Sequence, residues 1–141
     1  MVKISSQIWL GNILDSENEA SLKTQGVSAI LNVAAEANAR ELPGIYYIRV
    51  NLSDVNSNLK SQYKKALMGL EQMIEDEHTV LVHCMAGQSR RPAIVAGYLM
   101  LSEALDPYEA IYFVVSKKPD VVPNWDHLDM IASIVEEHRN G

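Results

Sequence analysis

The chain has 141 residues, of which 48% are hydrophobic and 21% charged, and these values fit one globular domain spanning residues 1–141. The formal net charge of −6 argues against nucleic acid as a partner, because proteins that bind the phosphate backbone usually present a basic face. No apolar run is long enough to cross a membrane, and the N-terminal residues lack the apolar stretch of a signal peptide, so we expect a soluble, monomeric, cytoplasmic protein without a membrane partner.

The first half of the chain predicts strands where β-branched and other apolar residues cluster between turn signals. We expect strands, the last two of them in the core, at residues 2–10, 27–33 and 45–50. A Gly-Asn turn at residues 11–12 follows the first of these regions. Asp15 or Ser16 is the expected cap of a short helix that runs to Lys23. The polar segment 34–44 predicts a loop.

The second half of the chain predicts helices around one more strand. From residue 59 to residue 76, apolar side chains recur at helical spacing on one face. Residues 79–83 are a short β-branched run, typical of a central parallel strand. Further helices are expected at residues 92–102, 107–116 and 124–137. Pro107 suits the first turn of its helix and Asn124 suits an N-cap.

Strands that alternate with helices predict an α/β fold with a mostly parallel central sheet and helices on both faces. In such sheets, functional sites form beyond the carboxyl ends of the strands. The segment that follows the predicted strand at residues 79–83 is therefore the first place to look for chemistry.

This segment, from His83 to Pro92, reads His-Cys-Met-Ala-Gly-Gln-Ser-Arg-Arg-Pro and leads from the predicted strand into a predicted helix. Backbone N–H groups in such a loop form an anion nest, and the helix start adds unpaired N–H groups. Cys84 lies at the loop entrance, where this environment would stabilise a thiolate nucleophile. The guanidinium of Arg90 can hold two phosphate oxygens at once. The candidate phosphate-binding loop comprises Met85, Ala86, Gly87, Gln88, Ser89 and Arg90.

A departing oxygen also needs a proton, and Asp54 lies in a loop just after a predicted core strand. If that strand neighbours the one before Cys84, Asp54 reaches the same sheet edge, where it can act as general acid and then as base for water. Taken singly, Cys84 would more often be a core thiol and Asp54 a turn residue; their combination with Arg90 points to catalysis. The single cysteine excludes an internal disulfide and a multi-cysteine zinc site, and we expect neither a metal nor another cofactor.

The sequence resembles the protein tyrosine phosphatase superfamily, whose signature is His-Cys, five residues and then Arg. The similarity to its small dual-specificity members covers nearly the whole chain. Matching residues lie at 8–12, 26–27, 30–33, 50–54, 93–100, 108–110, 117–119 and 123–124. The resemblance implies the three-layer fold of that superfamily and a phosphorylated protein as substrate. It implies that phosphotyrosine, and with it phosphoserine or phosphothreonine, is hydrolysed through a phosphocysteine intermediate. It further implies Asp54 as general acid and Asn124 as a brace for the loop, which His83 is expected to orient by hydrogen bonding.

One residue departs from the family pattern. Arg91 stands where relatives have a Ser or Thr whose hydroxyl is thought to assist the release of the cysteine in the second step. The phosphatases of regenerating liver also lack this hydroxyl and share the Arg-X-Pro pattern of residues 90–92. We therefore expect weak to moderate turnover, and a module that captures phosphorylated partners without turnover is the main alternative.

Two further hypotheses change the substrate or the reaction. A phosphoinositide or an RNA 5′-phosphate would suit a loop with more basic residues than Arg90 and Arg91. A sulfurtransferase would use Cys84 without an aspartic acid partner such as Asp54. The remaining histidines have no metal-ligand spacing and are expected on the surface: His78, His127 and His138.

Overall fold

The computed structural model of the chain describes residues 1–34, 39–52, 59–84 and 90–141, without the side chains of Arg90 and Arg91. Within these ranges a five-stranded sheet has the order β1-β2-β5-β3-β4. Its strands are β1 (Val2–Ser5), β2 (Ile8–Asn12), β3 (Ala29–Asn32), β4 (Tyr46–Arg49) and β5 (Val80–Cys84). β1 runs antiparallel to β2, and the other neighbouring pairs in this sheet are parallel, which confirms the predicted mostly parallel sheet.

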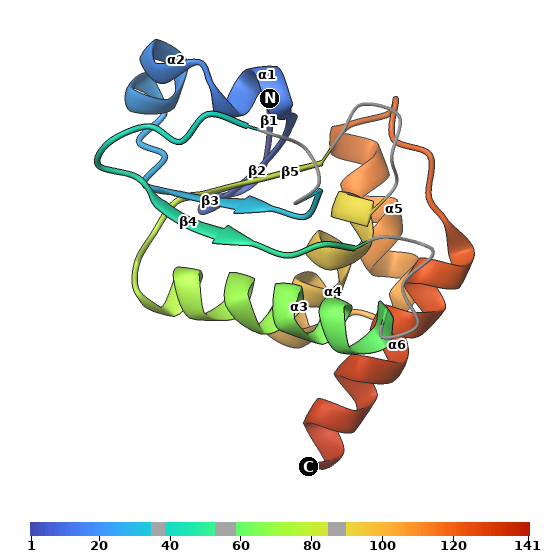
Figure 1. The fold of residues 1–141 in the computed structure, drawn as a ribbon. Helices are drawn as coiled ribbons and strands as arrows, with labels where there is room; N and C mark the ends of the chain where they lie inside the picture. Colours follow the sequence, from blue (N-terminus) through green and yellow to red (C-terminus); the bar gives the residue numbers. More distant parts are fainter. Residues whose placement is uncertain (35–38, 53–58, 85–89) are drawn as a thin grey trace.

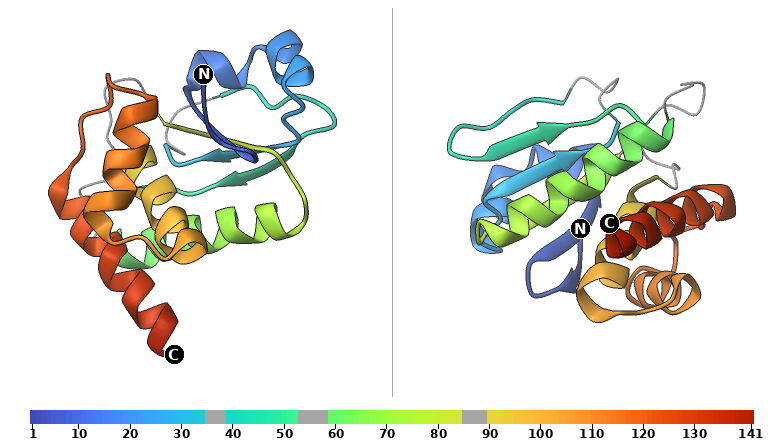
Figure 2. Two further views of the ribbon diagram at one scale, coloured as in Figure 1. Left: turned by 180° about the vertical axis from the view of Figure 1, so that it is seen from behind. Right: turned by 90° about the horizontal axis from the view of Figure 1, so that it is seen from below.

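Helices cover both faces of the sheet, as predicted (Figure 1). They are α1 (Ile13–Ser16), α2 (Glu19–Thr24), α3 (Leu59–Glu75), α4 (Arg90–Glu103), α5 (Pro107–Lys117) and α6 (Trp125–Asn140). The short helices α1 and α2 lie on one face, and α3 and α4 pack on the other. α5 and α6 contact α4, so this second face carries the thicker layer (Figure 2).

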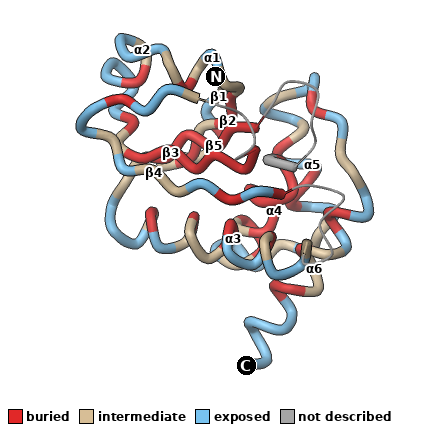
Figure 3. Tube along the Cα trace, viewed as in Figure 1, coloured by how far each residue is buried: buried red, intermediate tan, exposed pale blue. Residues whose placement is uncertain are grey.

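The core lies on both sides of β5, whose five residues are all buried. Successive side chains of a strand point to opposite faces. Accordingly, Leu81 packs with Ile30 and Leu22 in a small cluster under α2, whereas Val80 and Val82 belong to the large cluster under α3 and α4. Burial on both faces explains why this strand is a continuous apolar run without polar alternation. Figure 3 shows the buried strands at the centre of the molecule.

α4 is the central helix of the thick layer, in contact with α3, α5 and α6. Close packing at Gly97 is one reason why it fits. A Cβ atom at that position would lie 3.2 Å from Leu67 Cδ1 and 3.3 Å from Ile131 Cγ2, tighter than ordinary van der Waals contact. The absent side chain thus lets α4 approach α3 and α6 closely.

Two predictions for the N-terminal region are wrong. Residues 11–12 extend β2 instead of forming a turn, because they pair with His83 and Cys84 of β5. The single helix expected from Asp15 or Ser16 is two helices, α1 capped by Asn12 and α2 capped by Asn18. In each case the asparagine side chain accepts a hydrogen bond from a backbone N–H of the first turn, which satisfies a donor that the helix leaves unpaired.

The strand predicted at residues 45–50 exists as β4, but it is not a core strand. It lies at the edge of the described sheet and pairs only with β3 there. Tyr46 is 53% exposed for that reason. The predicted helices at 59–76, 92–102, 107–116 and 124–137 are confirmed as α3 to α6 with small shifts of their ends.

Candidate active site

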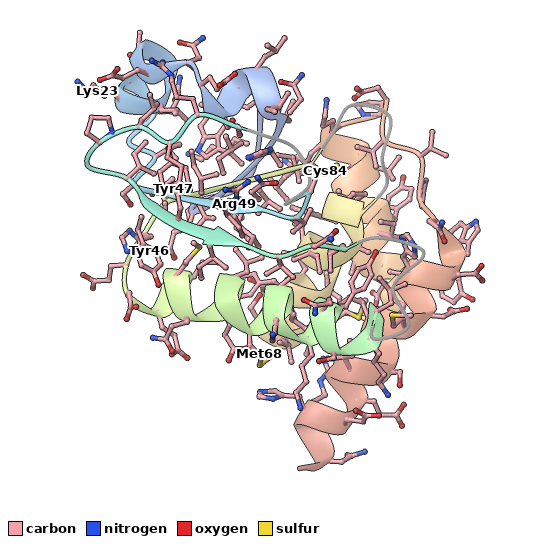
Figure 4. The ribbon with its side chains drawn as sticks, in the orientation of Figure 1. Lys23, Tyr46, Tyr47, Arg49, Met68 and Cys84 are labelled. Atoms are coloured by element: carbon pink, nitrogen blue, oxygen red, sulfur yellow. The ribbon has the colours of Figure 1, made fainter. Side chains whose placement is uncertain are left out.

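Cys84 ends the central strand of the sheet. It is fully buried and stands in register with Asn12 of β2, at the carboxyl edge where the parallel strands β2, β3 and β5 end (Figure 4). The predicted position of this residue, at the end of a buried parallel strand, is therefore confirmed. The pairing of Cys84 with Asn12 and of His83 with Asn32 holds this strand end between β2 and β3.

The alternation of β5 separates Cys84 from its neighbour His83. Cys84 belongs to the large core cluster together with Val80 and Val82, so its side chain lies on the α4 face. By the same alternation His83, which is 1% exposed, lies on the face of α1 and α2. The His83 carbonyl oxygen accepts a hydrogen bond from Val33 N at 2.9 Å, so its backbone helps to hold the strand end.

The chain enters α4 shortly after Cys84. Arg90 is the first residue of this helix and Arg91 the second, which confirms the predicted sequence of strand, short connection and helix. A helix start directed at this edge supplies unpaired N–H groups and a partial positive charge, both favourable for an oxyanion. The rest of the predicted phosphate-binding loop lies outside the described residues: Met85, Ala86, Gly87, Gln88 and Ser89.

Backbone hydrogen bonds bring the segment before Asp54 to the same edge of the sheet. Val33 N donates to the His83 carbonyl at 2.9 Å, and Leu52 N donates to the Val33 carbonyl at 3.4 Å. Leu52 is fully buried, so the chain is anchored two residues before Asp54. Asp54 itself lies outside the described residues. The strand before it, β4, is separated from β5 by β3, so the condition that these two strands are direct neighbours is not met.

Two asparagines at strand ends were missed in the sequence. Asn12 ends β2, and its Oδ1 accepts a hydrogen bond from Asp15 N at 3.0 Å while Asp15 Oδ2 accepts one from Asn12 N. Asn32 ends β3, is 2% exposed, and accepts a hydrogen bond from Ala34 N at 2.8 Å. Each side chain turns the backbone away as its strand ends beside Cys84. A polar residue closing a buried apolar run is the signal that could have identified them.

Asn124 and His127 connect the start of α6 to the core. Asn124 Oδ1 accepts a hydrogen bond from His127 N at 3.2 Å, which confirms Asn124 as the N-cap. His127 is 6% exposed, so its predicted surface position is wrong. Its ring lies 5.3 Å from that of Tyr63 on α3, because residue 127 falls on the buried face of α6 with Leu128 and Ile131.

Metal-binding clusters and membrane spans are both absent from the described part of the chain. It holds no group of three or more His, Cys, Asp or Glu residues that could bind a metal ion. Over the same residues, no helix is both long enough and apolar enough to span a bilayer.

Known proteins share both the sequence pattern and this geometry. The family model described as dual specificity phosphatase, catalytic domain, matches residues 8–137. Dual specificity protein phosphatase 22-A of Danio rerio is 33% identical over 126 residues, which cover 89% of this chain and 60% of that protein. The chain spans between 34% and 60% of the length of three such relatives, the zebrafish protein included.

Solved structures share the fold. Human DUSP28 superposes with a TM-score of 0.84 at 22% sequence identity, covering 99% of this chain and 99% of that chain. PTPMT1, solved in complex with PI(5)P, has a TM-score of 0.80 at 18% identity and covers 99% of this chain and 97% of its own. The three-layer fold that the sequence resemblance implied is thereby confirmed.

Proposed function

The chain belongs to the dual specificity phosphatase family, and on this premise we propose that it hydrolyses phosphate monoesters of protein side chains, phosphotyrosine first, through a phosphocysteine at Cys84. The observation that carries the proposal is the position of Cys84, the only cysteine, at the buried carboxyl end of the central strand just before α4. Phosphoserine and phosphothreonine are the further substrates that the family name suggests.

In the first step, the Cys84 thiolate attacks phosphorus and the bond from phosphorus to the ester oxygen breaks. The departing oxygen takes a proton from Asp54, so the substrate alcohol leaves neutral. Arg90 and the N–H groups of residues 85–89 would hold the three remaining oxygens as charge moves between them. The start of α4 at Arg90 and the anchoring of the chain at Leu52 support these roles.

In the second step, Asp54 takes a proton from water, the water oxygen attacks phosphorus, and the bond between sulfur and phosphorus breaks. Phosphate leaves and the thiolate returns. Arg91, the second residue of α4, stands where relatives have a hydroxyl that assists this release. We therefore expect the phosphocysteine to accumulate and the second step to limit turnover.

The alternative favoured by Arg91 is a phospho-binding module. If sulfur cannot leave, the site captures a phosphorylated partner, forms at most one phosphocysteine and stops. A phosphoinositide substrate is a third possibility for this site. PTPMT1, which has the same fold, was solved in complex with PI(5)P, and this supports a phosphoinositide substrate.

The test is hydrolysis of a small aryl phosphate across pH by the native chain, Cys84→Ser and Arg91→Ser. We expect activity in the native chain, none in Cys84→Ser, and a several-fold rise of kcat in Arg91→Ser, corresponding to about 1 kcal/mol of barrier. A burst of aryl alcohol before steady turnover would locate the slow step after phosphocysteine formation. Absence of turnover in all three, with phosphopeptide binding intact in the native chain, would establish the binding module instead.

We also propose a compartment and an oligomeric state for the protein. A catalytic thiolate must stay reduced, and the cytosol is the compartment that keeps thiols reduced, which supports a cytoplasmic protein. We expect a monomer whose partner is a phosphorylated protein. Light scattering at increasing protein concentration checks the monomeric state, and a mass that rises with concentration would contradict it.

A further inference from the structure

A groove crosses the end of the molecule opposite Cys84. It consists of three adjoining cavities of about 410, 180 and 280 Å³. The first two share Ser5, Leu99 and Glu103, and the last two share Tyr98 and Ser102, so the cavities are continuous. Because the β1–β2 turn at residues 6–7 lines the middle cavity, the groove lies at the amino end of β2, whereas Cys84 is level with the carboxyl end.

One end of the groove is an apolar pocket. Leu99 of α4 and Leu105 form it together with Phe113 of α5, which is 36% exposed. The contacts of β1 with α5 and of β2 with α4 hold the β1–β2 turn against these helices (Figure 2). A cavity of about 410 Å³ lined in this way accommodates a bulky aliphatic side chain.

Acidic side chains lie along the whole groove. Glu71 and Glu75, one turn apart on α3, line its far end. Glu103, at the end of α4, lines the middle cavity and the apolar pocket. Within the described residues, none of these three carboxylates makes an ion pair or a hydrogen bond. Elsewhere on the surface, acidic residues do have lysine partners: Lys23 with Glu19, Lys60 with Glu137 and Lys118 with Asp120.

The raised pKa of Tyr98 reflects both its burial and the negative charges in this groove. Burial raises the pKa of its hydroxyl above the ordinary value, and the negative charges of Glu71, Glu103 and Glu75 raise it further, while a hydrogen bond with Ser102 acts in the opposite direction. Among the described residues that line the three cavities there is no Lys, Arg or His. No positive side chain of the described groove lining therefore balances the negative charge of the three glutamates.

We propose that this groove binds a basic peptide segment of a partner protein, with an aliphatic side chain in the pocket of Leu99, Leu105 and Phe113 and lysine or arginine side chains beside Glu71, Glu75 and Glu103. Charge complementarity selects this occupant, because a cationic segment supplies the partners that the three carboxylates lack. A second copy of the chain is disfavoured, since each copy has a net charge of −6. The groove takes no part in the chemistry at Cys84, so the inference goes beyond the proposed hydrolysis.

The experiment is a fluorescence anisotropy titration with the fluorescein-labelled peptide Lys-Arg-Leu-Lys-Arg. We expect saturable binding to the native chain that weakens as salt rises. The triple variant Glu71→Gln, Glu75→Gln, Glu103→Gln keeps the side-chain volumes, and we expect it to bind about tenfold more weakly, from three charge contacts of partly exposed groups. Unchanged affinity in this variant overturns the proposal.

A matched control separates the groove from net charge. Glu19→Gln, Asp129→Asn and Glu136→Gln remove the same charge from exposed positions outside the groove, and we expect them to leave the affinity within twofold. An equal loss in the control variant means that the peptide follows net charge only, and this too overturns the proposal.

The apolar pocket is tested separately. Replacing the peptide's leucine by serine should weaken binding to the native chain several-fold, but should have little further effect on Phe113→Ser. If replacing the leucine by serine weakens binding equally to the native chain and to Phe113→Ser, the leucine does not occupy the pocket at Phe113, and this part of the proposal is wrong. Hydrolysis of a small aryl phosphate by the triple variant should equal that of the native chain. A native chain that binds the peptide but has no hydrolysis would therefore contradict the proposed function and leave the groove intact.

Discussion

The asparagines at the carboxyl end of the central sheet and the groove carboxylates at its amino end differ in what they contact. At the carboxyl end, Asn12 and Asn32 accept hydrogen bonds from nearby backbone N–H groups, so local bonds hold the chain beside buried Cys84. At the amino end, the groove carboxylates, Glu103 among them, have no such bond within the described residues. The difference indicates that the end beside Cys84 is held in fixed positions, whereas the groove presents carboxylates without a bonded partner among the described residues.

α4 belongs to both ends. It begins with Arg90 at the sheet edge where Cys84 lies, and its last turns supply Leu99 and Glu103 to the groove. Its 14 residues correspond to a length of about 21 Å at 1.5 Å per residue. Substitutions beside the start of α4, in its middle and outside both sites therefore test this difference between the two ends.

The largest effect is expected from Cys84→Ser. Serine preserves the shape of the buried side chain but is not a thiolate, so turnover of an aryl phosphate should fall at least about a thousandfold. Phosphopeptide binding and the basic-peptide affinity of the groove should persist, because neither depends on the nucleophile. Steady-state kinetics and anisotropy on the same samples check this, and residual turnover above a hundredth of the native rate would remove Cys84 from the mechanism.

Asp54→Asn should have the next largest effect. Removing a general acid costs about 10²- to 10⁴-fold in rate, and the loss should be greatest for a phosphotyrosine peptide, whose leaving oxygen needs the proton most. For an activated aryl phosphate with an acidic leaving group, the first step should change much less. Comparing kcat/KM for the two substrates checks the assignment. Equal activity of native chain and variant on both would favour a thiol enzyme without an acid partner, such as a sulfurtransferase.

Gly97→Val tests the middle of α4. The added side chain meets Leu67 and Ile131, which stand 3.2 and 3.3 Å from the Cβ position, so we expect a loss of about 1–3 kcal/mol in the free energy of unfolding. Valine has a better helix propensity than glycine, so propensity cannot account for such a loss. Lys65→Val, at an exposed position of α3, is the control for a valine on a helix surface. Urea unfolding of both variants checks the prediction, which is wrong if the two lose equal stability.

Local signals allowed much of the fold to be predicted. The spacing of apolar residues placed α3, because a helix that buries one face must repeat every three to four residues. Pro107 and Asn124 marked helix starts, since the fixed φ of proline and the side-chain oxygen of asparagine act within a single turn. The end of β5 at Cys84 and the start of a helix shortly after it could be predicted for the same reason, because a buried strand followed by a helix is encoded in consecutive residues.

What the sequence did not reveal depends on packing between distant segments. Nothing within β4 says that it lies at an edge with Tyr46 exposed, because that depends on where β3 and β5 pair. His127 was misplaced because a histidine suits the surface as well as a core position beside Tyr63. The groove is formed by the β1–β2 turn, α3, α4 and α5, which are distant in the sequence, so no single sequence motif predicts it.

The smallest effect is expected at the ion pair that joins α3 to α6, outside both sites. Lys60 Nζ lies 2.5 Å from Glu137 Oε1, and the hydrogen bond from Lys60, together with its charge, lowers the pKa of this carboxyl below its ordinary value. A carboxyl with a lowered folded-state pKa adds stability that is present above its unfolded value and is lost as pH falls through its folded value. Lys60→Met should therefore lower Tm slightly at neutral pH and not in acid well below the folded-state pKa, because both side chains are exposed and the pair is screened. Calorimetry under the two conditions checks this. A loss of the same size in acid would show that another contact of the ammonium group carries the effect, such as the hydrogen bond from Lys60 Nζ to Ser133 Oγ at 3.3 Å, and that the ion pair does not.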